Sequence, residues 1–164
     1  MKTGLPSKWA MVTLSTALIA CSEAPLPNTH FKTAQTVQAL KDTPVMPIAL
    51  QEVVDTYVLG GNRTDLQREA MTAKLLGATV SWRFKIYDIA KEDGRYRVMS
   101  ELMDGKETES FGKFAVVAYV TPKDEEDVQA LLKLQTGSEV EIRGRVNGVT
   151  VRTALVLSPA ELVR

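Results

Sequence analysis

The chain has 164 residues, with 20 basic and 20 acidic side chains and one histidine, so its formal net charge at neutral pH is zero. This length suits one modest domain. The balanced charge excludes a strongly basic nucleic-acid-binding protein. The single cysteine, Cys21, excludes an intrachain disulfide and a metal site built from several cysteines.

The amino terminus has the pattern of a secretory signal. Lys2 and Lys8 supply positive charge, and residues 10–20 follow without a charge and are mostly apolar. This apolar stretch is shorter than the roughly 20 residues that a membrane-spanning helix needs. We therefore expect export of the protein rather than a permanent transmembrane anchor.

The signal ends in Leu18-Ile19-Ala20-Cys21, which resembles the lipobox of bacterial lipoproteins. In that family the cysteine thiol receives a diacylglycerol, the signal is cut before it, and the new amine is acylated, usually with palmitate. The resemblance implies that residues 1–20 are a signal peptide and that Cys21 is the lipid attachment site. The alternative is an ordinary cleaved signal with a cysteine nearby by chance.

Residues 21–47 are polar and interrupted by prolines, which predicts a flexible tether behind the anchor. Ser22 stands where an aspartate favours retention at the inner membrane, so we expect the outer membrane, with the protein facing the periplasm. Loss of Lys2 and Lys8 with the signal leaves 18 basic against 20 acidic residues, a mature net charge of about −2.

Residues 48–76 predict two helices. Apolar residues at helical spacing mark the first, Ile48–Leu59, which the following glycine pair ends. The second begins at a capping box formed by Thr64 and Gln67, and Gly77 ends it. Its modest apolar stripe consists of Leu66, Ala70 and Ala73.

Three strands follow, at residues 79–89, 95–102 and 113–120. The first two alternate apolar and polar residues with a period of two, which is typical of strands with one buried face. The third is apolar on both faces, which predicts a central position in the sheet.

The last third of the chain predicts one helix and two strands. Thr121 is the expected N-cap and Pro122 the first helical residue. Strands are expected at residues 139–146 and 149–157, joined by a tight hairpin at Asn147-Gly148.

The order strand, strand, strand, helix, strand, strand resembles the OB-fold, a five-stranded Greek-key barrel. Residues 76–82 and 135–146 carry the resemblance, which is closest to OB families of the anticodon-binding-like type, although the first stretch lacks its second glycine. It implies an α+β barrel over residues 77–159, followed by a C-terminal tail at 160–164. An SH3-like barrel or an open sheet with two packed helices is the competing fold, and the helix after the third strand argues against it.

One surface of the predicted barrel could bind a ligand. Arg83, Lys85 and Tyr87 alternate outward on the first strand, and Arg95 and Arg97 can do so on the second. OB-folds commonly bind ligands here through stacking aromatics and cationic side chains. The alternative is an ordinary solvated face on a half-buried sheet.

If the first strand were turned the other way, Trp82 and Phe84 would face outward and its charged side chains would be buried, which is energetically unfavourable. Single-stranded nucleic acid is a poor candidate ligand, because the protein is expected outside the cytoplasm and neighbouring carboxylates would oppose phosphates. These carboxylates are Asp88, Glu92, Asp93, Glu139 and Glu141.

The sequence predicts neither catalysis nor a cofactor. The only histidine, His30, lies in the predicted tether, and no motif marks a Ser–Lys pair. The densest carboxylates, at 125–127 and at Glu107 and Glu109, form no metal-binding pattern, and the first group favours a helix dipole.

We therefore expect a lipid-anchored periplasmic protein whose barrel binds an envelope protein partner. The alternative function is binding of an anionic polymer or glycan through the Arg83, Lys85 and Tyr87 face. A hydrolase is the third and least favoured interpretation.

Overall fold

The computed structural model describes residues 39–106, 112–150 and 153–164. Cys21, His30 and most of the predicted tether lie outside these residues, as do Glu107 and Glu109. The elements are α2 (Leu50–Tyr57), α3 (Asp65–Leu75), β1 (Thr79–Glu92), β2 (Arg95–Ser100), β3 (Met103–Asp104), β4 (Lys113–Val120), α4 (Glu125–Lys133), β5 (Glu139–Thr150) and β6 (Ala154–Val163). Residues 39–42 are also helical.

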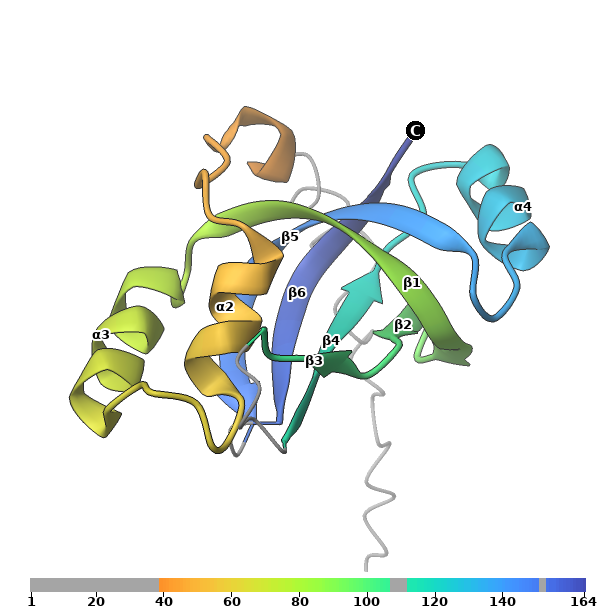
Figure 1. Ribbon diagram of the computed structural model, residues 1–164. Helices are drawn as coiled ribbons and strands as arrows, with labels where there is room; N and C mark the ends of the chain where they lie inside the picture. The colour runs from red at the N-terminus through yellow and green to blue at the C-terminus, as the bar shows by residue number, and fades with distance from the viewer. Residues whose placement is uncertain (1–38, 107–111, 151–152) are drawn as a thin grey trace, which may run out of the picture.

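Five of the strands close into a barrel (Figure 1). Strand β1 pairs with β2 and β5, β4 pairs with β2 and β6, and β5 pairs with β6. All of these pairings are antiparallel except that of β4 with β6. This ring, with α4 between the third and fourth barrel strands, is the OB topology, and the predicted fold class is confirmed. The central place of β4, between β2 and β6, is also as predicted.

Strand β1 is long enough to serve two neighbours. Its first half, from Thr79 to Lys85, pairs with β5, and its second half, from Ile86, pairs with β2. The register shifts between Ile86 and Asp88, and such a bulge bends a strand and increases its twist. The strand therefore curves over the barrel and divides its outer side between two parts of the sheet (Figure 1).

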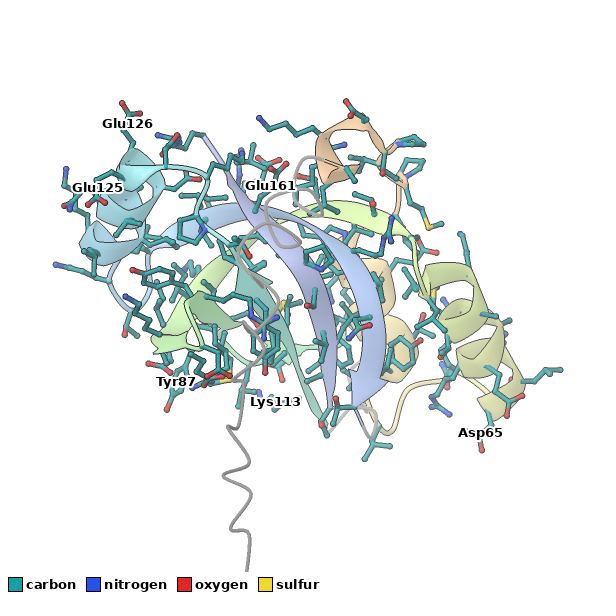
Figure 2. All side chains as sticks on the ribbon, turned by 180° about the vertical axis from the view of Figure 1, so that it is seen from behind. Asp65, Tyr87, Lys113, Glu125, Glu126 and Glu161 are labelled. Carbon is teal, nitrogen blue, oxygen red and sulfur yellow. The ribbon has the colours of Figure 1, made fainter. Side chains whose placement is uncertain are left out.

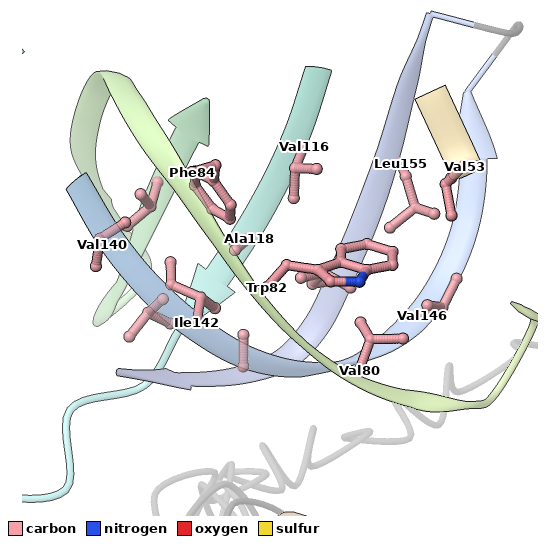
Figure 3. Close-up of a cluster of buried hydrophobic side chains, with 14 of the residues drawn as sticks. Val53, Val80, Trp82, Phe84, Val116, Ala118, Val140, Ile142, Val146 and Leu155 are labelled. Carbon is pink, nitrogen blue, oxygen red and sulfur yellow. The ribbon is translucent and has the colours of Figure 1, made fainter. Parts of the chain in front are cut away.

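The barrel interior is filled by the apolar residues that alternate along its strands (Figure 3). Trp82 and Phe84 are only 4% and 5% exposed, so the predicted inward phase of β1 is confirmed. Val53 of α2 lies among these barrel side chains in Figure 3 and belongs to the same buried cluster. The N-terminal helices and the barrel therefore share one core.

Helix α2 is joined to the barrel by apolar and polar contacts. Tyr57 stacks on Phe114 of β4 with ring centroids 5.6 Å apart, and its hydroxyl is 2.7 Å from the Thr72 hydroxyl of α3. The indole nitrogen of Trp82 donates to the Ile48 carbonyl at 2.9 Å. A buried indole N–H needs such an acceptor, so this contact sets where the chain enters α2.

Helix α3 begins at Asp65 with the predicted capping box of Thr64 and Gln67. Its packed side differs from the predicted stripe: Leu66 is 74% exposed, whereas Leu75 is fully buried. The stripe has helical spacing, but the contact with α2 and the barrel lies on the other side of the helix.

The predicted hairpin turn at Asn147-Gly148 was wrong. Both residues lie inside β5, where the register with β6 shifts between Val146 and Gly148. The chain reverses only after Thr150, whose carbonyl accepts from the Thr153 N–H at 2.9 Å. A glycine that suits a tight turn also suits a bulge, and here it serves the bulge.

Helix α4 also starts later than expected. Its N-cap is Asp124, whose carboxylate accepts from the Asp127 N–H at 2.8 Å, not Thr121. Thr121 follows β4 directly, and its N–H still donates to the Ala160 carbonyl of β6 at 3.0 Å. Residues 160–163, expected as a tail, complete β6 and pair with β5 as far as Val163.

Candidate binding surface

The outer side of β1 carries the residues predicted to bind a ligand. Arg83, Lys85 and Tyr87 alternate with buried apolar residues and are all exposed. Tyr87 is 57% exposed and sits at the bulge, where its carbonyl accepts from the Thr136 hydroxyl at 3.1 Å. Figure 2 shows Tyr87 well away from Asp65 of α3, so this surface and the outer helix are separate parts of the molecule.

Carboxylates of β5 neutralise the first half of this surface. Arg83 donates to Glu141 at 3.0 Å, and the Ser81 hydroxyl donates to the other oxygen of the same carboxylate at 2.9 Å. These hydrogen bonds, that from Arg83 first, hold the pKa of Glu141 below its usual range. Lys85 stands directly opposite Glu139 in the same ladder.

The second half is neutralised by β1 itself. The Arg97 guanidinium donates to Glu92 at 2.6 Å and lies 3.5 Å from a carboxylate oxygen of Asp88. The hydrogen bond to Glu92, with the charge of Glu92, raises the pKa of Arg97 above its ordinary value. Arg97 is therefore a paired cation within the sheet surface.

Arg95 makes a different contact. Its guanidinium carbon lies 5.1 Å from the centroid of the Tyr119 ring, an arrangement in which the cation is attracted to the aromatic face. Tyr119 is half-buried on the outer side of β4 and was not among the predicted site residues. Tyr119 was missed because the sequence of β4 is apolar on both faces. Its alternation with the buried Ala118 and Val120 is the signal that places it on the outer side.

The five predicted residues lie over different strand pairs. Because β1 changes partner at Ile86, Arg83 and Lys85 lie over the β1–β5 pair, whereas Arg95 and Arg97 lie over β2 and β4. Each group is faced by carboxylates. The resulting outer surface carries mixed charges, with Tyr87 and Tyr119 as its aromatic members.

The acidic residues at the start of α4 form ion pairs. Arg164 lies 3.1 Å from Asp124, 2.8 Å from Glu126 and 2.9 Å from the buried Asp127. The backbone N–H of Asp127, together with Arg164, lowers the pKa of Asp124. These carboxylates thus hold the end of β6 against α4.

The described part of the chain brings together no group of three or more metal-ligating side chains. Within the same residues no helix is both long enough and apolar enough to cross a bilayer.

Comparison with known protein families finds no matching family model, and no curated protein matches. Among solved structures, a protein from Klebsiella pneumoniae subsp. pneumoniae MGH 78578, provisionally described as a nucleic acid-binding lipoprotein, aligns with 77% of this chain and 97% of its own. That match has a TM-score of 0.45 and 19% identity. A chain of a replication protein A heterotrimer bound to ssDNA covers 74% of this chain and 83% of its own, with a TM-score of 0.38 and 11% identity.

Likenesses at these identities and TM-scores do not transfer a function. The OB assignment of this chain therefore rests on its own strand pairing: a closed five-stranded ring with one parallel contact and a helix before β5.

Proposed function

We propose that this protein is a lipid-anchored binding module of the cell envelope, without enzymatic activity, whose barrel contacts a protein partner through the outer side of β1, β2 and β4. The observation that carries the proposal is the pairing of two cations on this surface, Arg83 and Arg97, with carboxylates. Arg83 is paired with Glu141, and Arg97 is paired with Glu92 and Asp88.

A site for an anionic polymer depends on cations that are free to replace counterions along the polymer. Paired cations attract such a ligand weakly, because each nearby carboxylate cancels much of the field. Protein interfaces, in contrast, combine arginine and tyrosine with a polar rim of mixed charge. Tyr87, Tyr119 and Arg95 on this surface fit that composition.

The anchor is supported by the lipobox that ends at Cys21. One acyl chain holds a protein only marginally at a membrane, whereas two or more hold it stably. Mass spectrometry of protein extracted from membranes should show an acylated Cys21 at the amino terminus. A soluble species with a free thiol at this position would contradict the anchor but not the binding module.

Photo-crosslinking in intact cells tests the protein partner. A photoreactive amino acid at Tyr87 or Arg95 should give one adduct of defined mass with another envelope protein, whereas the same amino acid at Glu69 on α3 should give none. Equal labelling from all three positions, or no adduct from any, would overturn the proposal.

The second candidate function is binding of a glycan or anionic polymer. The contact of Arg95 with the half-buried Tyr119 ring favours it, because a cation beside an accessible aromatic edge can also hold a sugar or a planar ligand. Binding of purified lipopolysaccharide or peptidoglycan fragments that weakens strongly from low to high salt would favour this function.

A further inference from the structure

The first half of β1 has two edges, and only one of them is covered by β5. On the other edge, the Thr79 carbonyl accepts from the Met46 N–H and the Lys85 carbonyl accepts from the Glu101 N–H, both at 2.8 Å. The backbone N–H and C=O groups of Val80, between these two residues, point to β5 instead. Backbone direction alternates along a strand, so residues of odd number in this stretch point away from β5.

The backbone groups of Ser81 and Arg83 therefore point to the second edge. The same alternation holds at the even-numbered Ile86, whose N–H donates to the Ser138 carbonyl at 2.9 Å on the β5 side. Among residues 39–106, 112–150 and 153–164, no hydrogen bond reaches the N–H or C=O groups of Ser81 or Arg83 on their free side. Two donors and two acceptors thus form an open stretch of sheet edge.

The segments on either side stop short of this stretch. Val45 pairs in parallel with Thr79, but the next N–H that could continue the pairing, that of Ile48, donates to the Met46 carbonyl at 2.9 Å instead, and the chain turns into α2. From the other direction, the pairing of β2 with β1 ends where Ser100 meets Ile86. The gap between them spans residues 81–83.

The side chains of Ser81, Trp82 and Arg83 do not lie over this edge. Both Ser81 and Arg83 bond to Glu141 of β5, which draws them toward the paired edge. Trp82 between them points into the core. An unpaired edge of this kind is a template for an additional strand.

We infer that the edge at Ser81–Arg83 binds an extended segment of the protein partner by strand addition. The partner segment supplies two N–H and two C=O groups, and the flanking contacts of Met46 and Glu101 limit the paired stretch to about three residues. This inference rests on the proposed function, because it names the contact by which the module holds its partner.

Amide exchange in the full chain, solubilised in detergent, tests the edge directly. Without a ligand, the amides of Ser81 and Arg83 should exchange rapidly. An excess of a short capped peptide of alternating valine and threonine should slow both amides at least about tenfold, whereas the same peptide N-methylated on its edge-facing residues should not. Amides already protected in the free protein, no slowing by the peptide, or equal slowing by the N-methylated peptide would overturn the inference.

A matched pair of variants tests the edge in cells. Ser81→Pro removes the N–H that points to the open edge and leaves the β5 ladder intact, whereas Ser81→Ala removes only the hydroxyl. The adduct formed from Tyr87 should be lost in Ser81→Pro and retained in Ser81→Ala. If Ser81→Pro keeps the adduct, strand addition is wrong and the binding module stands; if the unchanged protein gives no adduct, the proposed function itself fails. Should Ser81→Pro not fold, the amide-exchange experiment decides.

Discussion

At the scale of single residues, Glu141 organises the outer side of the β1–β5 pair. Its two carboxylate oxygens accept from Ser81 and Arg83, and these bonds lower its pKa. The same residue removes a free cation from the predicted ligand face and holds two side chains away from the open edge of β1. One carboxylate therefore shapes both the electrostatics and the accessibility of the surface.

The lowered pKa of Glu141 predicts a pH dependence of stability. A carboxyl group with a folded-state pKa below its unfolded value stabilises the fold fully above the unfolded pKa, and this contribution is lost as the pH falls through the folded pKa. Glu141→Gln should therefore be less stable than the unchanged protein at neutral pH, and the difference should shrink below about pH 4. Urea unfolding across this range measures it, with Glu69→Gln as the control for loss of one exposed carboxylate. A difference that stays constant with pH would contradict the ion-pair assignment.

At the scale of elements, α3 offers two leucines in opposite surroundings. Leu75 is fully buried in the shared core, whereas Leu66 is 74% exposed. The helix is held to α2 partly by polar contacts: Arg68 donates to the Thr56 carbonyl at 3.1 Å near the end of α2. This donation satisfies a carbonyl that a helix end would otherwise leave without a partner.

The same substitution at these two leucines should have very different effects. Leu75→Ala should lower the free energy of unfolding by about 2–5 kcal/mol, because it leaves a cavity in the core. Leu66→Ala should change it by less than about 0.5 kcal/mol, because the side chain is already in water. Urea unfolding of both variants checks the packed side of α3. Comparable losses would show that the predicted stripe is the buried one after all.

The close pairing of β5 with β6 depends on a glycine. A Cβ atom at Gly144 would lie 3.0 Å from the Cβ atoms of both Leu157 and Ala160 and 3.2 Å from the Pro159 carbonyl oxygen. At Gly148, in the same strand, a Cβ would meet nothing within 4 Å. The strands therefore approach closely at one point of the ladder and not at the other.

Gly144→Ala should consequently destabilise the protein by about 1–3 kcal/mol, because the added methyl group overpacks this contact. Gly148→Ala is the matched control and should unfold within about 0.5 kcal/mol of the unchanged protein. Thermal unfolding of the two variants compares them. Equal midpoints would mean that β6 can move aside at Gly144.

At the scale of the whole molecule, helices occupy both sides of the barrel. Figure 1 shows α2 and α3 on one side and α4 on the other. Val53 and Tyr57 of α2 are buried with barrel residues, and Leu131 of α4 joins the same cluster. The helices on both sides therefore pack into the same core as the barrel strands.

Because the N-terminal helices and the barrel share one core, we expect them to unfold together. Cleavage of the signal removes Trp9, so Trp82 fluorescence reports the barrel of the mature protein, and far-ultraviolet circular dichroism reports the helices. The two signals should follow one urea transition with the same midpoint. Two separated transitions would show that the N-terminal helices form an independent unit.

Local chemistry made much of the fold predictable. Alternation from Val80 to Ile86 placed the buried face of β1, because a charged side chain is costly to bury. The capping box at Thr64 and the strand at Lys113–Val120 depend on neighbouring residues alone and were predicted at the right positions. The order of the five barrel strands and α4 along the chain was also predicted, whereas the short strand β3 was not.

Other features depend on contacts between distant residues. The outward position of Tyr119 beneath Arg95, and the pairing of Arg83 with Glu141, join strands that only the closed barrel brings together. Asn147-Gly148 could form a turn or a bulge, and the register with β6 decided for the bulge. By itself the sequence thus determined the strands and their inward face, because side-chain chemistry and spacing act locally, and the resemblance of their order to the OB-fold implied the barrel. Only the tertiary structure decided which charges are paired and which edge of β1 is open, because both depend on how the strands pair with one another.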